Sequence, residues 1–379
     1  MRISGLELIE IRLPLRESFT ASFGSRSHRR ILLLRLEGSE MEEGLGECVA
    51  GEDPSYSYET TETVWHILNR FILPMVLGCE IQGPEDIATV SAAVRGHPMA
   101  KAAVEMAVWD LQAKELGVPL WELLGGSGSP VPVGVSVGIQ PDDAALLQKA
   151  DEYLARGYAR VKLKIKPGRD VNTVRAVRER FPVAQLSVDA NAAYTLADAA
   201  LLKELDAFGL LMVEQPLGCQ DFTDHSRLQE LLDTPICLDE SIRSEGDARL
   251  ALELGACQVV SVKPGPVGGL ASARAIHNLC VERGVPAWCG GMLESGIGRA
   301  HNLCLATLPG FSLPGDISES RRYWDQDIVS PEFTLDQGQM MPPVEPGIGV
   351  EPDRDRIRRL AVRHVSYGRL HRPVVEVQS

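Results

Sequence analysis

The chain has 379 residues, of which 44% are hydrophobic and 24% are charged, so it can bury a large core as two domains or as a barrel with an attached domain. Its 38 Lys and Arg residues against 52 Asp and Glu residues give a net charge of −14. This charge repels a phosphate backbone and an anionic lipid surface, so we expect neither nucleic acid nor a membrane as partner.

The N-terminal segment 1–15 alternates apolar and polar residues as a β-strand does. Glu7 and Glu10 interrupt its apolar run, which argues against a signal peptide, and no stretch of the sequence approaches transmembrane length. The eight cysteines form no CxxC pair, and several lie within apolar runs. Such thiols are typical of a reducing compartment, so we predict a cytoplasmic protein.

Further along the chain, short apolar runs alternate with helical patterns in which apolar residues recur at i, i+3 and i+4. This alternation predicts parallel βα units, and eight strands with seven helices between them favour a closed barrel over an open sheet. The predicted strands are 131–138, 160–165, 185–190, 209–214, 235–240, 258–263, 285–290 and 311–316.

Charged side chains recur at the last or second-to-last position of five neighbouring predicted strands, 24 or 25 residues apart. In a parallel barrel these positions form a ring at the C-terminal mouth, where barrel enzymes place their chemistry. One carboxylate at a strand end is more often a helix N-cap or a solvated loop residue. Five ionisable groups in phase with the repeat favour a functional site instead. They are Lys164, Asp189, Glu214, Asp239 and Lys263.

The strand at 160–165 shows which face of the sheet carries these charges. Lysines at 162, 164 and 166 alternate with the aliphatic residues Val161, Leu163 and Ile165. In an isolated antiparallel sheet the lysines would face water, but helices cover the outer face of a parallel barrel. We therefore expect the aliphatic residues to pack on the helices and the lysines to point into the barrel.

Asp189, Glu214 and Asp239 would lie together at the barrel mouth, and three carboxylates cannot all stay ionised there without a cation. Their oxygen ligands, with no His or Cys at an equivalent position, favour Mg²⁺, or Mn²⁺ as a substitute, over Zn²⁺. The sequence thus predicts a magnesium site with positions left open for water and substrate.

Lys164 and Lys263 flank the three carboxylates from opposite sides. A divalent cation disfavours the protonated form of a nearby lysine, and Lys162, on the same strand face as Lys164, would add a like charge that tunes it. A metal ion between two lysines fits the removal of a proton α to a carboxylate, with stabilisation of the resulting enediolate.

These residues resemble the enolase superfamily, specifically its muconate-lactonizing subgroup. The matching motifs are KLK at 162–164, VDAN around Asp189, EQPL at Glu214, LDES at Asp239 and VKPG at Lys263. Within the subgroup, TASFGSRS, GVSVGIQ, AWCGGMLESGIGRAHN and LPGDIS resemble the family of o-succinylbenzoate synthases and N-succinylamino acid racemases.

This resemblance implies an α/β fold in which an α+β capping domain covers a modified TIM barrel of the (β/α)7β type. The cap would span residues 1–125 and be completed by residues 320–379, and the barrel would span 126–320. A small-molecule carboxylate substrate and a homo-oligomer are implied as well.

The resemblance also implies roles for the residues at the barrel mouth. Asp189, Glu214 and Asp239 would bind Mg²⁺. Lys162, Asn191 and Glu240 would contact these ligands without binding the ion themselves. In a synthase, which dehydrates 2-succinyl-6-hydroxy-2,4-cyclohexadiene-1-carboxylate for menaquinone biosynthesis, Lys164 would take the α proton and help the hydroxyl leave as water, while Lys263 stabilises the enediolate from the opposite face. In an N-acylamino acid racemase, each lysine would serve one face of the substrate.

Substrate contacts are implied at three places. Phe19, Phe23 and Tyr56 match cap loops that close over the site, although ordinary core packing is an equal alternative for the two phenylalanines. Ser136 lies at the mouth of the first barrel strand. The stretch that would receive the succinyl end is Gly291, Met292 and Leu293.

Two positions depart from the family pattern. Racemase-capable relatives commonly carry Arg three residues after the second lysine, where this chain has Pro266; the loss of a positive charge near Lys263 disfavours racemisation. Gly51 stands where relatives often have a bulkier apolar residue, which predicts an altered pocket. The synthase and the racemase both stay open, as do dipeptide epimerases and cycloisomerases. A barrel that has lost catalysis is disfavoured, because both lysines and all three carboxylates are present.

Overall fold

A computed structural model describes residues 1–22, 24–38 and 42–370. In this part of the chain, seven parallel strands form a curled sheet in the order β11-β10-β9-β8-β7-β6-β5. The strands are β5 (Gly134–Val137), β6 (Arg160–Lys164), β7 (Leu186–Asp189), β8 (Val213–Glu214), β9 (Ile236–Leu238), β10 (Val259–Val262) and β11 (Ala287–Cys289). The predicted α/β barrel architecture is confirmed.

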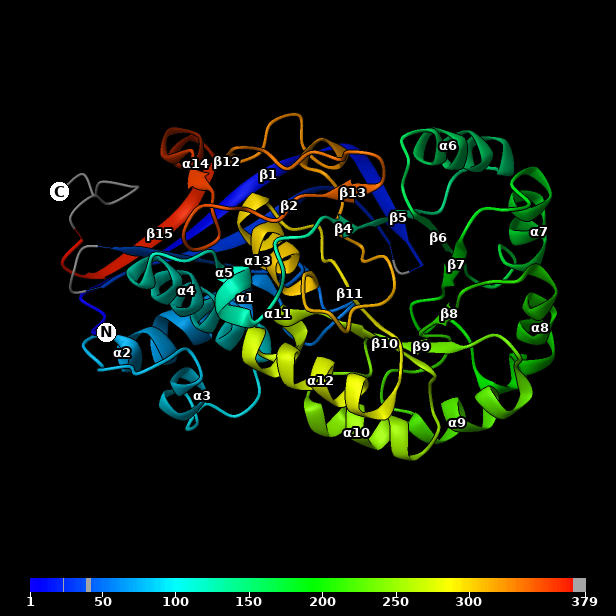
Figure 1. The fold of residues 1–379 in the computed structure, drawn as a ribbon, viewed down its shortest axis with the longest axis horizontal. Helices are drawn as coiled ribbons and strands as arrows, with labels where there is room; N and C mark the ends of the chain where they lie inside the picture. The colour runs from blue at the N-terminus through cyan, green and yellow to red at the C-terminus, as the bar shows by residue number, and fades with distance from the viewer. Residues whose placement is uncertain (23, 39–41, 371–379) are drawn as a thin grey trace.

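Helices connect successive strands and form the outer layer of the barrel (Figure 1). They are α6 (Asp143–Ala155), α7 (Val171–Arg180), α8 (Ala199–Lys203), α9 (Phe222–Leu231), α10 (Glu245–Glu253), α12 (Leu270–Arg283) and α13 (Gly296–Ala306), with the short α11 (Pro264–Val267) directly after β10. Because the connections run strand to helix to strand, every barrel strand points its carboxyl end toward the same mouth.

The predicted eighth strand, 311–316, does not form a regular strand. It closes the barrel instead through separate bonds to both edge strands: the amide of Asp316 donates to Cys289 on β11, and the carbonyl of Gly315 accepts from Gly134 on β5. The first predicted strand is also split, since the short β4 (Val131–Pro132) pairs outside the barrel with β13 (Gln339–Met340).

The alternation predicted for β6 is present. Val161 and Leu163 are fully buried toward the helices, while Arg160 and Lys162 face inward and stack on the ring of Trp288, at 4.3 Å and 4.9 Å from its centroid. Lys166 lies beyond the end of the strand in a tight turn, because β6 ends at Lys164. Only the first two lysines therefore belong to the inward face.

An antiparallel sheet in the order β15-β1-β2-β3 lies beside the barrel and carries its own helices (Figure 1). The strand β15, from the C-terminal part of the chain, pairs with the N-terminal β1. The elements are β1 (Gly5–Ala21), β2 (Gly24–Glu37), β3 (Glu43–Cys48), α1 (Thr61–Ile67), α2 (Leu73–Val76), α3 (Asp86–Val90), α4 (Pro98–Leu116), α5 (Leu120–Leu124), β12 (Val329–Ser330), β14 (Glu351–Pro352), α14 (Arg354–Leu360) and β15 (Ala361–Gly368). None of the described helices combines the length and apolar character needed to cross a bilayer.

Buried carboxylates of the cap fix it to the N-termini of two barrel helices. Glu105 on α4 accepts hydrogen bonds from the backbone amides of Leu270 and Ala271, both at 2.8 Å, where α12 begins without a side-chain cap of its own. Glu47 on β3 accepts from the amides of Ser295 and Gly298 at the start of α13. An acidic side chain at a helix N-terminus satisfies free amides and complements the helix dipole, so the two parts hold each other in register.

We predict that Glu105→Ala lowers the free energy of unfolding by about 2–4 kcal/mol, because it leaves two buried amides and the Trp109 indole without an acceptor. The measurement is urea unfolding followed by circular dichroism. Glu85→Ala, which removes an exposed ion pair with Arg274, is the matched control and should change stability by less than about 1 kcal/mol. Equal effects of the two substitutions would contradict the capping role.

Candidate active site

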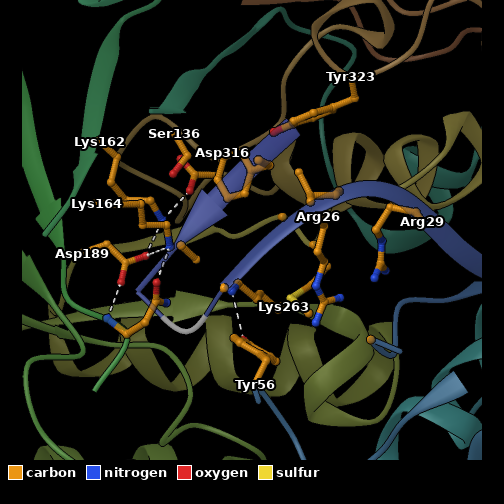
Figure 2. Close-up of a pocket in the computed structure, with 18 residues that line it drawn as sticks. Arg26, Arg29, Tyr56, Ser136, Lys162, Lys164, Asp189, Lys263, Asp316 and Tyr323 are labelled. Atoms are coloured by element: carbon orange, nitrogen blue, oxygen red, sulfur yellow. Dashed lines mark hydrogen bonds and ion pairs between the residues drawn. The ribbon is translucent and has the colours of Figure 1, made fainter. Parts of the chain in front are cut away.

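A cavity lies between the barrel mouth and the cap, and Figure 2 shows the side chains that surround it. Most of the predicted substrate and catalytic residues meet here although they come from distant parts of the chain. The predicted residues that line the cavity are Phe19, Tyr56, Ser136, Lys162, Lys164, Asp189, Asn191, Lys263, Gly291, Met292 and Leu293. Phe19 thus faces the cavity, whereas Phe23 lies outside the described residues.

The parallel register of the strands brings the predicted carboxylates together. Lys164 pairs with Asp189 across β6 and β7, and Asp189 pairs with Glu214 across β7 and β8. Asp239 follows directly after β9, the next strand in the sheet. Asp189, Glu214 and Asp239 are each at most 3% exposed, so their charges act on one another with little screening by water.

Lysine ammonium groups neutralise these carboxylates in the structure. Lys164 Nζ lies 2.5 Å from Asp189 Oδ2, and Lys263 Nζ lies 2.6 Å from Asp239 Oδ2. Lys162 Nζ contacts Glu214 Oε2 at 2.7 Å and Asp189 Oδ2 at 3.3 Å. Each ammonium therefore faces a carboxylate that the sequence assigned to a metal ion.

Burial and neighbouring charge shift these groups in opposite directions. Burial, together with the charge of Asp189, raises the pKa of Glu214 to about 8. The pKa of Asp189 is lowered well below its usual value, because the attraction of Lys164 and Lys162 outweighs its burial. The pKa of Lys263 is raised despite its burial, since Asp239 lies against it. The site thus holds one strongly ionised carboxyl group and one that readily keeps a proton.

Among the described residues, no three His, Cys, Asp or Glu side chains already converge as they would around an ion. The chemistry of the donors nevertheless fits a hard cation. Glu214 Oε1 and Glu240 Oε2 are buried without a hydrogen-bond partner, and such unsatisfied oxygens are costly unless another group meets them. Asn191 links Lys164 to Glu240. Its side-chain oxygen accepts a hydrogen bond from Lys164, and its side-chain nitrogen donates one to Glu240 at 2.9 Å.

Backbone strain gathers where the strands end. Asn191, two residues after the end of β7, and Gln215, one residue after the end of β8, adopt positive φ angles of 45° and 37°, a conformation that costs energy in residues other than glycine. The fully buried Gln215 accepts from the amides of Asp239 and Ser241, both at 3.1 Å, and thereby ties the end of β8 to the end of β9. Sequence reasoning missed Gln215, although its place directly after a predicted metal ligand was a signal.

Asp316, on the segment that closes the barrel, was also missed. Its carboxylate bridges two buried cations of β6: Oδ1 lies 2.6 Å from Arg160 and Oδ2 lies 2.5 Å from Lys162. Asp316 stands in the LPGDIS motif at the end of the last predicted strand, and that position could have suggested its role. Other cavity residues that the sequence did not single out are Ala21, Gly24, Arg26, Arg29 and Tyr323.

The cap contributes Tyr56 to the second lysine. Lys263 Nζ donates to the Tyr56 hydroxyl at 3.0 Å and lies 4.9 Å from the centre of its ring. Burial, assisted by Asp239, raises the pKa of this tyrosine well above its usual value, so it stays a neutral phenol. Pro266 lies just behind, in a small cavity that it shares with Tyr56, Glu240 and Arg243.

A capped barrel in which two lysines line one cavity, from strands on either side of three acidic strand ends, is typical of enzymes that remove a proton from carbon. Two family models match the chain: the "Mandelate racemase / muconate lactonizing enzyme, N-terminal domain" over residues 5–125 and the "Enolase C-terminal domain-like" family over residues 145–356. The chain belongs to the enolase superfamily, as the motifs predicted.

Curated relatives place it more narrowly. It is 51% identical to an o-succinylbenzoate synthase of Geobacillus stearothermophilus over 93% of this chain and 94% of that protein. It is 50% identical to an N-succinylamino acid racemase of Thermus thermophilus over 92% of this chain and 95% of that protein. A solved enolase-superfamily structure from Listeria innocua superposes with a TM-score of 0.93 at 41% identity and covers 97% of this chain and 99% of that one.

We predict that Asp316→Asn destabilises the protein by about 3–5 kcal/mol, because it leaves the buried Arg160 and Lys162 without their shared carboxylate. The measurement is the free energy of unfolding in guanidinium chloride. Asp325→Asn, at a carboxylate that is 85% exposed and 3.7 Å from Arg16, serves as the control. If both variants were equally stable, Asp316 would not be holding these cations.

Proposed function

We propose that this chain catalyses the Mg²⁺-dependent dehydration of 2-succinyl-6-hydroxy-2,4-cyclohexadiene-1-carboxylate to 2-succinylbenzoate, a step of menaquinone biosynthesis. The observation that carries the proposal is that Lys164 and Lys263 face one cavity from strands on either side of three acidic strand ends. The synthase names of relatives 45% to 51% identical to it agree with this reaction.

The chain's own residues would divide the work between two faces of the substrate. Lys164, oriented by Asp189 and Asn191, would remove the proton α to the carboxylate and return it to the departing hydroxyl, which leaves as water. Lys263, held by Asp239 and the Tyr56 hydroxyl, would stabilise the negative charge that develops on the substrate. The cap contributes Phe19, Arg26 and Tyr56 to the cavity wall and would thereby limit the access of water.

Asp189, Glu214 and Asp239 would hold Mg²⁺, or Mn²⁺ in its place. Asn191, Glu240 and Lys162 would contact these ligands and not the ion. Two observations support this assignment: the ligands are all hard oxygens, and Glu214 Oε1 lacks a partner. Bound there, the ion would polarise the substrate carboxylate and thereby make the α proton more acidic.

Racemisation of N-succinylamino acids is the second candidate, because lysines on both faces could each exchange the α proton. Relatives from Thermus thermophilus and an Amycolatopsis species carry that activity in their names. Pro266 favours the synthase as the main activity. It places an apolar ring in the small cavity beside Tyr56, where racemase-capable relatives commonly have a positively charged Arg.

We also place the protein in the cytoplasm. Each of its eight cysteines is free, and six are buried, a pattern that fits a reducing compartment. The homo-oligomer stays a prediction of the family resemblance.

The test of function is a parallel assay of the purified protein with Mg²⁺ on the cyclohexadiene precursor and on an N-succinylamino acid. We expect a higher kcat/KM for dehydration. Lys164→Ala and Lys263→Ala should each lower it by about 10³-fold or more, whereas Lys166→Ala, beyond the end of β6, should retain it. Racemisation faster than dehydration would reverse the assignment, and no turnover of either substrate would refute both.

Magnesium binding has a separate test. Addition of Mg²⁺ at about 100 times its Kd should stabilise the folded protein by about 2.7 kcal/mol, measured as a rise in Tm. We expect Glu214→Gln to abolish this rise, because the variant loses a charged oxygen ligand. Glu245→Gln, on the exposed start of α10, should keep it. An unchanged Tm of the parent protein would contradict the metal site.

A further inference from the structure

The cavity has a second charged side, across from Lys162 and Lys164 (Figure 2). Arg26 and Arg29, both on β2, lie side by side across the cavity from Lys164 and Asp189 (Figure 2). The register of β1 against β2 shifts between Pro14, which pairs with His28, and Phe19, which pairs with Arg26. An irregularity of this kind redirects side chains, which is consistent with both arginines lining one cavity although they stand three positions apart. The mechanism described above uses neither of them.

Arg29 is a buried cation without a direct counter-ion. Its side chain is 2% exposed and donates to the carbonyl of Val49 at 2.9 Å, while its Nε has no partner. No ion pair joins Arg29 to any carboxylate within the described ranges. Burial, and then the charge of Arg26, lowers its pKa, which Glu47 and Glu294 partly offset. A buried guanidinium in this state favours an anion beside it.

The two carboxylates whose charge raises the pKa of Arg29, Glu47 and Glu294, accept hydrogen bonds from other donors. Glu47 accepts from Ser295 and Gly298, as described above, and Glu294 accepts from the amide of Met292 and the side chain of Asn302. They contribute negative charge at a distance but no bidentate contact. The hydrogen-bonding capacity of Arg29 therefore stays available to a ligand in the cavity.

Gly51 makes room for Arg26. A Cβ atom at position 51 would lie 2.9 Å from Arg26 Nη1 and 3.0 Å from Nη2, closer than real side chains approach. The guanidinium thus fills the space that any larger residue at 51 would take. Its partner Asp53, at 3.1 Å, is half exposed and is not among the residues that line the cavity, whereas Arg26 is.

We propose that Arg26 and Arg29 bind the carboxylate at the far end of the substrate's acyl chain and make the enzyme selective for dicarboxylates. The inference rests on the proposed function, because the first carboxylate would lie at the lysine end. Guanidinium groups match carboxylates through paired N–H bonds, and the predicted succinyl stretch, residues 291–293, lines the same cavity as the two arginines.

The test compares two ligands that differ only at that far end: 2-succinylbenzoate and the amide of its succinyl carboxylate. Calorimetry in the presence of Mg²⁺ should show tighter binding of the acid to the parent protein. We expect Arg26→Met to weaken binding of the acid by about 10- to 100-fold, the value of a charge-assisted hydrogen bond, and to change binding of the amide by less than about 3-fold.

Two further variants test the geometry. Gly51→Met should reproduce the selective loss by displacing Arg26 without removing a charge, and the double variant with Arg26→Met should lose little more. Arg29→Lys should also lose selectivity, because an ammonium cannot pair with both carboxylate oxygens. Arg12→Met, on the exposed face of the same sheet, is the control and should bind both ligands like the parent.

The outcomes separate this inference from the proposed function. A parent protein that turns over the precursor but binds acid and amide equally would overturn the arginine assignment and leave the reaction intact. Selective binding that depends on Arg26, in a protein inactive on both substrates, would support the assignment and refute the reaction. Equal weakening of both ligands in Arg26→Met would show general damage and contradict the inference.

Discussion

The structure depends on the compensation of buried charge at the barrel mouth. Parallel strands must end at one edge, so carboxylates placed at successive strand ends are forced together. Lys162 lies at the centre of this arrangement, within 3.3 Å of Asp189, Glu214 and Asp316. The desolvation cost of burying the Lys162 ammonium is offset by the carboxylates around it. The cost of burying those carboxylates is offset in turn by the cations that contact them. The same balance prepares the site for a divalent ion and an anionic substrate.

The cap completes the site and does more than cover it. The carboxylates of Glu47 and Glu105 accept hydrogen bonds from backbone amides at the N-termini of barrel helices. These bonds fix the cap against the barrel mouth. In this position of the cap, the Tyr56 hydroxyl contacts Lys263, and Arg26 and Arg29 of β2 line the cavity. Catalysis and recognition are thus supplied by different parts of the chain: the barrel provides the lysines and acids, and the cap provides the end of the pocket that would read the acyl chain.

Strain and polarity are concentrated in the same place. The left-handed conformations of Asn191 and Gln215 follow the strands that carry two of the acidic residues, and each of these side chains bonds across to a neighbouring strand or lysine. Surrounding contacts hold these strained positions, which is how proteins keep functional side chains oriented. Tight packing of the helices around the sheet supplies the rigidity this requires.

The sequence by itself determined the periodic features of the protein. The 24- or 25-residue spacing of charges located Lys164, Asp189, Glu214, Asp239 and Lys263 at strand ends, because in-phase βα units repeat their geometry. Only the tertiary structure revealed Gln215, Asp316, Arg26 and Arg29 as parts of the site. Gln215 acts through hydrogen bonds to the next strand end, and Asp316 lies on the irregular segment that closes the barrel. The two arginines lie beside a register shift in β2, and Arg26 occupies the space left by Gly51. No sequence period encodes such contacts, because they arise where the repeat is broken and where distant segments pack.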